Sequence, residues 1–377
     1  MKDRIKVVQL LPTMADGGAE TLVKDYTLLC DRDKVDMQVV VWSEPLGSAN
    51  ERILQQNNIK VTYLGEAARK KSLLGRVRRR VGKYLTFRNI ILTQDIDVIH
   101  IHLRFDKYLR VLPKAALKRV KLFYTLHNEP QKFFAPNGEG DKHVEYKEAK
   151  RLIDKYDMTV ITLHDEMNKL VRALFSTDRV VTINNGINLQ RFSPDIYDKG
   201  VIRKELGICE DAFVIGHVGS FTEQKNHRFL LDIFEEYLQK DPEAMLLLTG
   251  RGVLKDEVRA DVNARGLADR VMILKGRDDI PQIMKSMDVF VMPSRWEGFP
   301  VTLIEAQSMG LPCVISDVIN EEVVLTDKVY RVSLDAPVGA WIEAIEGKHE
   351  PADRAGSLED RDIRRSISRL EEMYAQS

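Results

Sequence analysis

Two glutamates, Glu297 and Glu305, combine with the turn between them into the segment of this chain best suited to chemistry. Residues 289–293 just before them form a short apolar run, which predicts a buried strand. Pro300 suits the first helical position, where its missing N–H costs nothing. We therefore expect Glu297 in the loop at the strand's carboxyl end. Glu305 should lie about one and a half turns into the following helix.

The backbone amides of Gly298 and Phe299 are expected to point out of the positive end of that helix, where an anion would be held. One carboxylate then flanks the anion and the other lies a little below it. This layout suits a sugar nucleotide, with its diphosphate at the helix end and hydroxyl groups on both sides. Lys225, which also precedes an expected helix, could neutralise a diphosphate leaving group. A solvated surface lysine is the commoner alternative.

Further loops carry weaker signals. Gly17 and Gly18 lie between an expected strand and helix, so their amides could approach a phosphate or sugar, or could serve only the turn. His127 ends a strand and could donate to a sugar hydroxyl or act as an acid or base. His100 and His102 end the preceding strand, and we interpret them as packed imidazoles outside the site.

Two arginines close other expected strands. Arg251 lies in Gly250-Arg-Gly252, and Arg277 follows Gly276. Both segments could border a nucleotide, and both could be ordinary turns.

The elements that must position these residues alternate between strand-like and helix-like patterns along the whole chain. Most of the apolar runs are rich in Val and Ile, as buried parallel strands are. We expect strands at 5–11, 37–42, 59–64, 97–102, 120–126, 158–163, 179–184, 213–218, 245–249, 271–274, 289–293, 312–316 and 329–333. Such alternation predicts an α/β fold with doubly wound parallel sheets.

The chain has 377 residues, which favours two domains. We expect a Rossmann-like domain over 1–190 and another over 191–359, with a helix at 360–377 packing back on the first. Asn185-Gly186 and the polar segment 191–199 mark the boundary. Ligands of such sheets bind at the carboxyl ends of the strands, so the cleft between two facing domains is the expected site.

Composition excludes several classes of protein. Hydrophobic and charged contents of 44% and 30% are those of a soluble globular protein, and the formal net charge of zero gives no global field for nucleic acid. The three cysteines show no metal-ligand spacing and no disulfide framework. The apolar core near the start is too short for a signal peptide. We expect a cytoplasmic protein.

Charge is concentrated in one stretch, between Ala67 and Gln94, which holds nine basic residues and no acidic one. The basic residues are Arg69, Lys70, Lys71, Arg76, Arg78, Arg79, Arg80, Lys83 and Arg88. Leu73, Leu74, Val77, Val81, Tyr84 and Leu85 share one face of the helix expected over 69–88. A basic amphipathic helix of this kind suits an anionic membrane surface. A core-packed helix with a solvated basic back is equally compatible, and nucleic acid is a weaker alternative.

With these residues in view, the chain resembles a retaining glycosyltransferase of GT-B architecture, from family 4 (glycosyltransferase group 1). It is most similar to bacterial enzymes that build exopolysaccharide or capsule. The resemblance covers nearly the whole chain and is most specific over 219–227 and 288–317. The Glu297 and Glu305 spacing is the family's hallmark, and Asn185-Gly186-Ile187-Asn188 looks like its interdomain segment.

The resemblance implies a role for each candidate. Glu297 would lie by the anomeric centre of the donor sugar, and Glu305 would bind the ribose hydroxyls. Lys225 and the amides of Gly298 and Phe299 would hold the diphosphate. The resemblance further implies that His127 would face the sugar from the first domain and that the Gly17-Gly18 loop would approach donor and acceptor. Transfer would retain the anomeric configuration and need no metal or other cofactor.

One position departs from the pattern. Many relatives place an arginine where this chain has Ser220, as a second cation on the diphosphate. Its absence leaves Lys225 with more of the charge, and Arg277 or Arg251 could compensate.

The resemblance therefore implies transfer of a hexosyl unit from a UDP- or GDP-sugar to a lipid-linked or saccharide acceptor. The basic helix 69–88 favours a lipid-linked acceptor and a peripheral position on the inner face of the cell membrane. A UDP-sugar epimerase of the same architecture and a non-catalytic sugar-nucleotide-binding protein stay open. A dehydrogenase is disfavoured, because the G-x-G-x-x-G fingerprint is absent.

Overall fold

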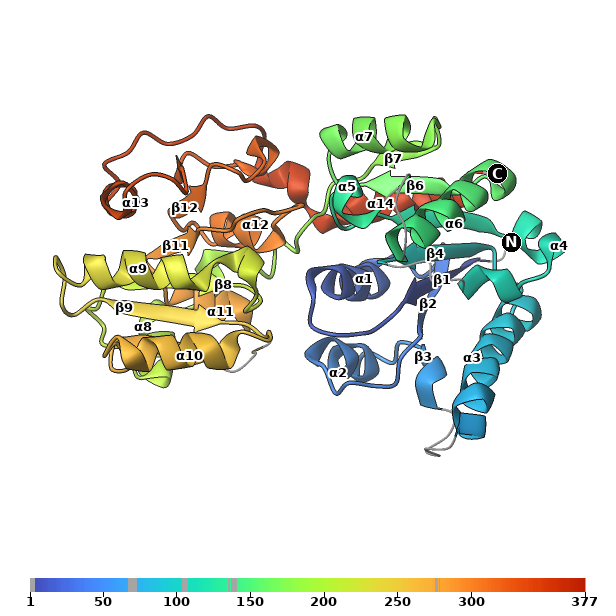
Figure 1. Cartoon of the computed structure of the whole chain (residues 1–377), viewed down its shortest axis with the longest axis horizontal. Coiled ribbons are helices and arrows are strands. Elements are labelled where there is room, and N and C mark those ends of the chain that lie inside the picture. Colours follow the sequence, from blue (N-terminus) through green and yellow to red (C-terminus); the bar gives the residue numbers. More distant parts are fainter. Residues whose placement is uncertain are drawn as a thin grey trace. The chain divides into compact units, whose positions relative to one another are not determined.

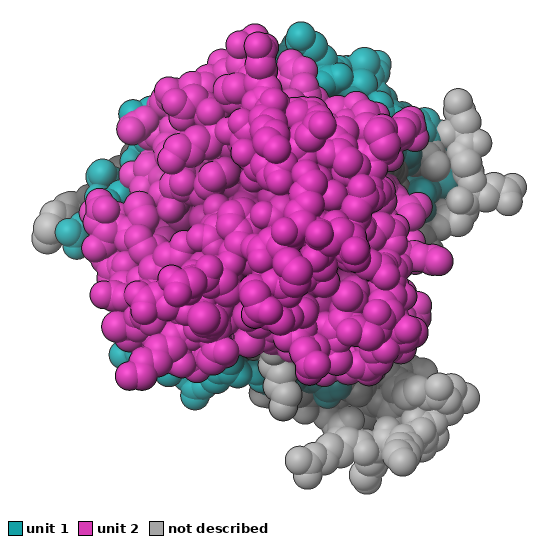
Figure 2. Space-filling model, turned by 90° about the vertical axis from the view of Figure 1, so that its left-hand side faces the viewer, with its two compact units in different colours: residues 1–185, 363–377 teal, residues 186–362 magenta. Residues whose placement is uncertain are grey.

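The chain folds into two compact α/β units (Figures 1 and 2). The computed structural model describes residues 4–66, 73–103, 108–134, 136, 141–274, 277 and 279–376. The first unit consists of residues 1–185 and 363–377, and the second of residues 186–362. The structure thus divides the chain after residues 185 and 362, whereas the boundaries expected from the sequence lie after residues 190 and 359.

The first unit is built on a seven-stranded sheet with the order β3-β2-β1-β4-β5-β6-β7. Every pairing described in it is parallel. The order reverses between β1 and β4, so the loops after these strands flank the usual ligand position of such a sheet. The strands are β1 (Ile5–Leu11), β2 (Val35–Val41), β3 (Val61–Tyr63), β4 (Val98–His102), β5 (Lys121–Thr125), β6 (Thr159–Thr162) and β7 (Val180–Thr182).

The second unit holds a six-stranded sheet with the order β10-β9-β8-β11-β12-β13. Its described pairings are also parallel, and the order reverses between β8 and β11. The strands are β8 (Val214–Val218), β9 (Met245–Thr249), β10 (Val271–Leu274), β11 (Val289–Met292), β12 (Cys313–Ser316) and β13 (Val329–Val332). Three of them, β8, β11 and β12, are buried at every position, which explains their continuous apolar runs.

Helices cover the first sheet (Figure 1). They are α1 (Gly18–Leu29), α2 (Ala49–Gln56), α3 (Leu73–Thr93), α4 (Lys114–Arg119), α5 (Pro130–Phe133), α6 (Asp141–Tyr156), α7 (Asp165–Phe175) and α14 (Ile363–Ala375). The last of these comes from the far end of the chain. Its residues Ile367, Leu370 and Tyr374 pack in one core cluster with Val7 of β1 and Tyr26 of α1. The first unit is thus completed by the end of the sequence.

Helices of the second unit follow its strands in the same alternating way. They are α8 (Lys199–Leu206), α9 (His227–Tyr237), α10 (Lys255–Ala264), α11 (Ile280–Lys285), α12 (Val301–Ser308) and α13 (Val338–Ile345). The short 3₁₀ segments of the chain are Leu64–Glu66, Tyr108–Val111, Pro194–Ile196, Glu223–Lys225, Glu321–Val323 and Leu358–Arg361. Phe234 of α9 and Trp341 of α13 are fully buried in the main core cluster of this unit.

The thirteen expected strands are all present, and the two expected parallel sheets of an α/β fold are confirmed. Their observed ends differ from the expected ones by at most two residues. Pro300 is a small correction, because it precedes the helix as its N-cap instead of occupying the first helical position. Its φ of −76° still suits the helix entry, so the loop after β11 leads directly into α12.

Helix α3 has two apolar faces. Phe87, Ile90 and Ile91 are buried in the core of the first unit, whereas Val81 and Leu85 are 50% and 57% exposed. Among the basic residues expected here, Lys83 donates to the carbonyl of Trp42 and Arg88 is exposed. Arg69, Lys70, Lys71 and the side chains of residues 73–80 lie outside the described residues. No helix within the described ranges combines the length and the apolar character needed to cross a bilayer.

Candidate active site

Lys225 and Glu297 form an ion pair in the second unit. The ammonium Nζ lies 2.6 Å from the carboxylate Oε1, and the two side chains are 13% and 6% exposed. Lys225 follows β8 and Glu297 follows β11, the two strands between which the sheet order reverses. The sequence placed both residues at this edge, and the structure brings them into direct contact. A cation and a carboxylate largely withdrawn from solvent interact strongly with any charged ligand that reaches them.

The neighbours of Lys225 hold this pair in place. Gln224 donates from Nε2 to the second oxygen of Glu297 at 3.0 Å, and its carbonyl accepts the amide of Arg295 at 2.8 Å. Asn226 has a left-handed backbone (φ 54°), which turns the chain into α9, and its side chain donates to the carbonyl of Pro293 at 3.2 Å. The loop after β8 is thereby fastened to the loop after β11.

Glycines let the loops after β8 and β9 pack backbone against backbone. A Cβ on Gly250 would lie 1.9 Å from the carbonyl oxygen of Gly219, and one on Gly252 would lie 2.3 Å from that of Phe221. A Cβ on Gly219 would in turn lie 2.7 Å from His217 Nε2 and 3.2 Å from Lys225 Cε. These glycines therefore have a steric role, which allows the stem of Lys225 to cross the loop.

Two buried histidines lie beneath Lys225. His217 donates from Nδ1 to the carbonyl of Val291 at 2.8 Å, and its ring meets that of His227 edge-on at 5.0 Å. Burial, together with the nearby charge of Lys225, lowers the pKa of His217 well below its ordinary value and that of His227 to about 4. Both rings are therefore neutral at neutral pH, and the local positive charge belongs to Lys225.

The turn before α12 carries the expected anion-binding amides. Gly298 and Phe299 directly precede the N-cap of this helix, and Glu305 lies half-buried in its second turn. The guanidinium of Arg361 lies 5.2 Å from the ring centroid of Phe299, which is 8% exposed. Arg361 also donates to the carbonyl of Glu322 at 2.9 Å. A cation stacked on Phe299 stabilises this turn from a distant part of the sequence.

The three residues considered as further diphosphate contacts differ in their surroundings. Ser220 is exposed, and the next residue, Phe221, donates its amide to the carbonyl of Arg251 at 2.9 Å. The backbone of Arg251 is therefore next to the loop after β8 that carries Lys225. Arg277 donates to both carboxylate oxygens of Asp279, at 2.7 Å from Nε and 2.5 Å from Nη2. This pairing raises the pKa of Arg277. Gly276 and Asp278 lie outside the described residues.

In the first unit, Gly17 is the N-cap of α1. A Cβ on Gly17 would lie 2.5 Å from the carboxylate of Glu20, whereas Gly18 faces open space. Glu20 is buried, accepts from the hydroxyl of Thr13 at 2.9 Å, and burial raises its pKa. Gly17 thus leaves space for the Glu20 carboxylate in the first turn of α1, while the space at Gly18 leaves room for a ligand.

His127 follows β5 and is half-buried. Its Nε2 lies 3.0 Å from Nδ1 of His102, whose Nε2 lies 2.8 Å from Oε1 of Gln9. Burial lowers the pKa of His127 to about 4, so its ring is neutral at neutral pH. His102, which we interpreted as a packed imidazole, is fully buried and also supports the candidate histidine. Much of the loop at 135–140 lies outside the described residues.

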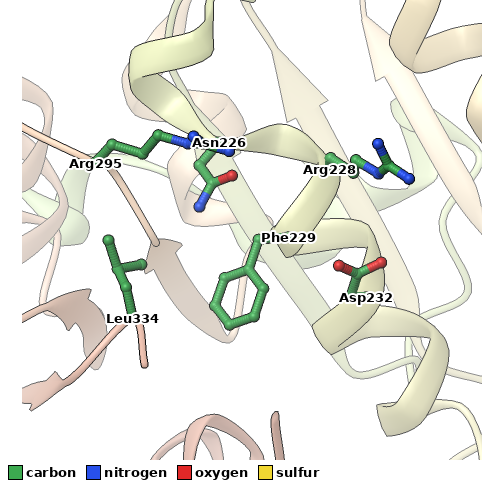
Figure 3. A pocket seen from close by; sticks show the side chains of 6 residues that line it. All are labelled: Asn226, Arg228, Phe229, Asp232, Arg295 and Leu334. Atoms are coloured by element: carbon green, nitrogen blue, oxygen red, sulfur yellow. The ribbon is translucent and has the colours of Figure 1, made fainter. Parts of the chain in front are cut away.

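A pocket of about 360 Å³ opens beside the loop that carries Lys225 (Figure 3). Arg295 and Arg228 come from opposite sides of it, with Phe229 between them (Figure 3). Its remaining lining residues are Asn226, Asp232 and Leu334. None of the residues expected in the site lines it, although Asn226 is adjacent to Lys225 and Arg295 lies two residues before Glu297.

Sequence reasoning missed Gln224, Asn226, Arg361, Gln9 and His102. The first two lie next to Lys225, so their position in the loop was the available signal. Arg361 and Gln9 had no such signal, because their partners are remote in sequence. Within the described residues there is no group of three or more His, Cys, Asp or Glu side chains placed to hold a metal ion.

Comparison with known protein families identifies both halves of the chain. Residues 16–191 match the model of Glycosyltransferase Family 4, and residues 212–347 match that of Glycosyl transferases group 1. The chain is a group 1, family 4 glycosyltransferase. The family recognised from residues 219–227 and 288–317 is thus confirmed, and so is the prediction of a transferase enzyme.

Individual relatives resemble this glycosyltransferase over most of its length. It is 28% identical over 346 residues to the Bacillus subtilis (strain 168) glycosyltransferase EpsF, covering 90% of this chain and 86% of the relative. It is 24% identical to an Escherichia coli UDP-Gal:alpha-D-GlcNAc-diphosphoundecaprenol alpha-1,3-galactosyltransferase, with 84% and 80% covered.

Solved structures share the fold of this glycosyltransferase. The crystal structure of HepE from Anabaena, in complex with UDP and glucose, superposes with a TM-score of 0.74 at 21% identity and covers 98% of this chain and 99% of that one. WaaG, a glycosyltransferase involved in lipopolysaccharide biosynthesis, gives a TM-score of 0.70 at 14% identity, with 99% and 100% covered.

Proposed function

We propose that this glycosyltransferase moves a hexosyl unit from a UDP- or GDP-sugar to a lipid-linked or saccharide acceptor in bacterial polysaccharide biosynthesis. The Lys225–Glu297 pair at the ends of β8 and β11 is the observation that carries the proposal. The relatives support it. HepE was crystallised with UDP and glucose, and the Escherichia coli relative is named for transfer from UDP-Gal to a diphosphoundecaprenol-linked sugar.

The second unit is the donor-binding domain in this proposal, and the first is the acceptor domain. Lys225 and the amides of Gly298 and Phe299 hold the diphosphate, while Glu305 binds the ribose hydroxyls. Glu297 binds the donor sugar beside its anomeric carbon. Arg251, whose backbone adjoins the loop of Ser220, supplies positive charge that a serine lacks. In the first unit, the Gly17-Gly18 loop and His127 contact substrate.

The proposed reaction retains the anomeric configuration and uses no metal ion. The bond between the anomeric carbon and the diphosphate oxygen breaks while the acceptor oxygen bonds to the same face of that carbon. The acceptor hydroxyl gives its proton to the leaving diphosphate. Lys225 stabilises the negative charge that develops on the diphosphate, in place of a divalent cation. Transfer should therefore continue in the presence of EDTA, and loss of activity with recovery on adding Mg²⁺ would contradict this part.

Glu297→Ala tests the proposed site directly. We expect this variant to fold normally and to lose transfer, measured as nucleotide release with acceptor present. Near-normal turnover would refute the assignment of Glu297. A thermal-shift panel of UDP-, GDP- and ADP-sugars identifies the donor, since a specific ligand stabilises in proportion to its affinity. Incubation with UDP-N-acetylglucosamine alone should give no epimer, which separates transfer from epimerisation.

A lipid-linked acceptor would require this glycosyltransferase to reach a membrane surface, and α3 is suited to that contact. Val81 and Leu85 project from it with 50% and 57% exposure, in the stretch that carries nine basic residues and no acidic one. We propose that this face binds an anionic lipid surface, where exposed apolar groups insert and cations meet the headgroups. The enzyme would then act as a peripheral protein on the inner face of the cell membrane.

Flotation with liposomes tests this contact. We expect binding to anionic vesicles that weakens in the variant Val81→Ser/Leu85→Ser and at high salt. Val201→Ser is the matched control, because Val201 is 55% exposed on α8 of the other unit. Equal binding of the wild type to neutral and anionic vesicles would argue against the proposal.

A further inference from the structure

Three side chains form a continuous hydrogen-bonded row across neighbouring strands of the first sheet. Gln9 lies in β1, His102 ends β4, and His127 follows β5. His102 is fully buried and contacts the other two, with Nε2 at 2.8 Å from Gln9 Oε1 and Nδ1 at 3.0 Å from His127 Nε2. His102 is thus the one link between an interior amide and a partly exposed imidazole.

The direction of the row is set by the amide of Gln9. Its Nε2 lies 3.3 Å from the thioether sulfur of Met37 and 3.3 Å from the hydroxyl of Tyr374. A thioether sulfur can only accept a hydrogen bond, so the amide end beside it is the NH₂ group. The oxygen of Gln9 therefore points to His102. Because an amide oxygen can only accept, the proton of His102 must be on Nε2.

The same logic continues to the next ring. Burial keeps His102 and His127 neutral, because it lowers the pKa of His127 to about 4 and that of His102 well below its ordinary value. A neutral imidazole carries one N–H, so His102 Nδ1 is an acceptor. His127 must then donate from Nε2, so Nδ1 of His127 is unprotonated and its lone pair can accept a hydrogen bond. This nitrogen has no hydrogen-bond partner within the part of the chain that the structure describes.

A second row supports this direction. The hydroxyl of Tyr374 accepts from Gln9, so its own proton is available to His100 Nδ1 at 2.6 Å. His100 Nε2 then donates to the hydroxyl oxygen of Thr125 at 2.7 Å. In this assignment the Tyr374 hydroxyl and the neutral His100 ring each accept one hydrogen bond and donate one, and no donor faces another donor. Tyr374 belongs to α14, so the last helix helps to orient the amide of Gln9.

We propose that Gln9 and His102 are positioning residues, which hold His127 in the tautomer whose Nδ1 accepts a hydrogen bond from a substrate hydroxyl. This inference rests on the proposed function, in which His127 contacts substrate. From the sequence we expected His127 to donate to a sugar hydroxyl or to act as an acid or base, and the proposal replaces these roles with acceptance of a hydrogen bond. A fixed tautomer spares the enzyme the cost of selecting one when substrate binds.

Nitrogen-15 NMR of the full chain tests the tautomer without substrate. The eight histidines are labelled, and His127 and His102 are assigned by loss of their signals in His127→Asn and His102→Asn. We expect both rings to carry their proton on Nε2 at pH 7.5. A protonated Nδ1 on His127 in the wild type would overturn the proposal, whatever the variants do.

Gln9→Met removes the amide while keeping the length of the side chain. We expect the His127 signals to show a mixture of tautomers, and turnover to fall by about tenfold, as for loss of roughly 1.4 kcal/mol of hydrogen bonding. Gln9→Glu keeps an acceptor oxygen and should retain the Nε2–H tautomer and most of the turnover. Unchanged tautomers and turnover in Gln9→Met would contradict a positioning role.

Gln38→Met is the matched control. Gln38 is a buried glutamine of β2, and its amide bonds to Gln94 instead of to a histidine. The control should leave the His127 tautomer unchanged. A changed tautomer in Gln38→Met would mean that Gln9→Met acts only through general disturbance of sheet packing. The NMR result also separates the two proposals. If His127→Ala transfers sugar normally, the substrate contact of His127 is wrong, while the tautomer assignment is still decided by the spectra.

Discussion

The ammonium of Lys225 lies 2.6 Å from the carboxylate of Glu297, so the main cation of the candidate site is already neutralised by a neighbour. A diphosphate that binds Lys225 has to compete with this carboxylate. The pair is largely buried, where the interaction is strong and little screened by salt. Glu297 therefore sets the affinity for the leaving group as well as contacting the sugar in the proposed reaction.

Glu297→Gln should separate these two effects. We expect turnover to fall by at least about a hundredfold, as when a main electrostatic contact of a transition state is removed. UDP should bind more tightly than to the wild type, because Lys225 no longer faces a carboxylate. Calorimetric titration with UDP measures this. Glu346→Gln, which breaks an exposed pair with Lys240 in the same unit, should change neither property. Weaker UDP binding by Glu297→Gln would contradict the prediction.

Lys225→Met should leave the Glu297 carboxylate buried without its cation. Breaking a buried pair in this way costs about 3 kcal/mol in the free energy of unfolding, measured with urea. UDP affinity should fall at least about tenfold, since a charge-assisted contact is lost. The double variant Lys225→Met/Glu297→Gln should recover part of the stability and none of the affinity. Full additivity of the two single changes in stability would show that the pair is not coupled.

Arg251→Ala should raise the KM for the donor severalfold, because Arg251 lies beside the loop of Ser220 and is proposed to supply its missing charge. Ser220→Arg in the same chain should lower this KM again. Arg277→Ala is the informative comparison, because its guanidinium is already paired with Asp279. Unchanged donor kinetics in both arginine variants would dispose of compensation by either residue.

Arg361→Leu should weaken the turn that presents Gly298 and Phe299. We expect the donor KM to rise severalfold, and stability to fall by about 1–2 kcal/mol through loss of the stacked cation. Arg361→Lys should recover little, since an ammonium lacks the flat guanidinium face. Arg259, an exposed arginine of α10, offers a control substitution to Leu. Normal donor kinetics in Arg361→Leu would show that Phe299 keeps its position without this cation.

Acid should destabilise the fold through its buried histidines. Burial lowers the pKa of His100 to about 3 and that of His227 to about 4, from an ordinary 6.5. These rings stay neutral in the folded protein but gain a proton in the unfolded chain below pH 6.5. Their contribution to stability is therefore complete above pH 6.5 and is lost progressively as the pH falls from 6.5 through about 4 for His227 and about 3 for His100.

Urea unfolding at pH 7.5, 6 and 5 should show this loss, and His227→Phe should reduce its slope by up to one proton. Phe221→Leu removes the ring stacked 4.3 Å from His227 and adds no titratable group, so it should lower stability equally at each pH. An unchanged slope in His227→Phe would mean that His227 already carries its proton when folded.

The strands could be predicted because a buried parallel strand appears in the sequence as a continuous run of apolar residues. Lys225 and Glu297 could be paired for a similar reason, since each follows such a run and parallel strands end at one edge of their sheet. The bond from His102 to His127 depends on the register between β4 and β5, which apolar runs do not encode. Arg361 lies far in sequence from Phe299, and only folding brings the two together.

The pocket beside Arg295 was also beyond prediction, because three different loops or helices contribute its lining. The composition of α3 gave its amphipathic character, but not which apolar side chains are buried. Val81 and Leu85 share a helical pattern with core residues and are nevertheless exposed. Their position depends on how α3 packs against Trp42 and its neighbours, which is a tertiary property.

The packing of α14 against β1 and α1 has a consequence for how this protein is made. During synthesis the first seven strands leave the ribosome long before Ile367, Leu370 and Tyr374 are added to the chain. Until then, the apolar side chains of the sheet that contact α14 lack this packing. The second unit, whose residues are contiguous, can reach its final form earlier. The half of the enzyme that is translated first is therefore the half that matures last.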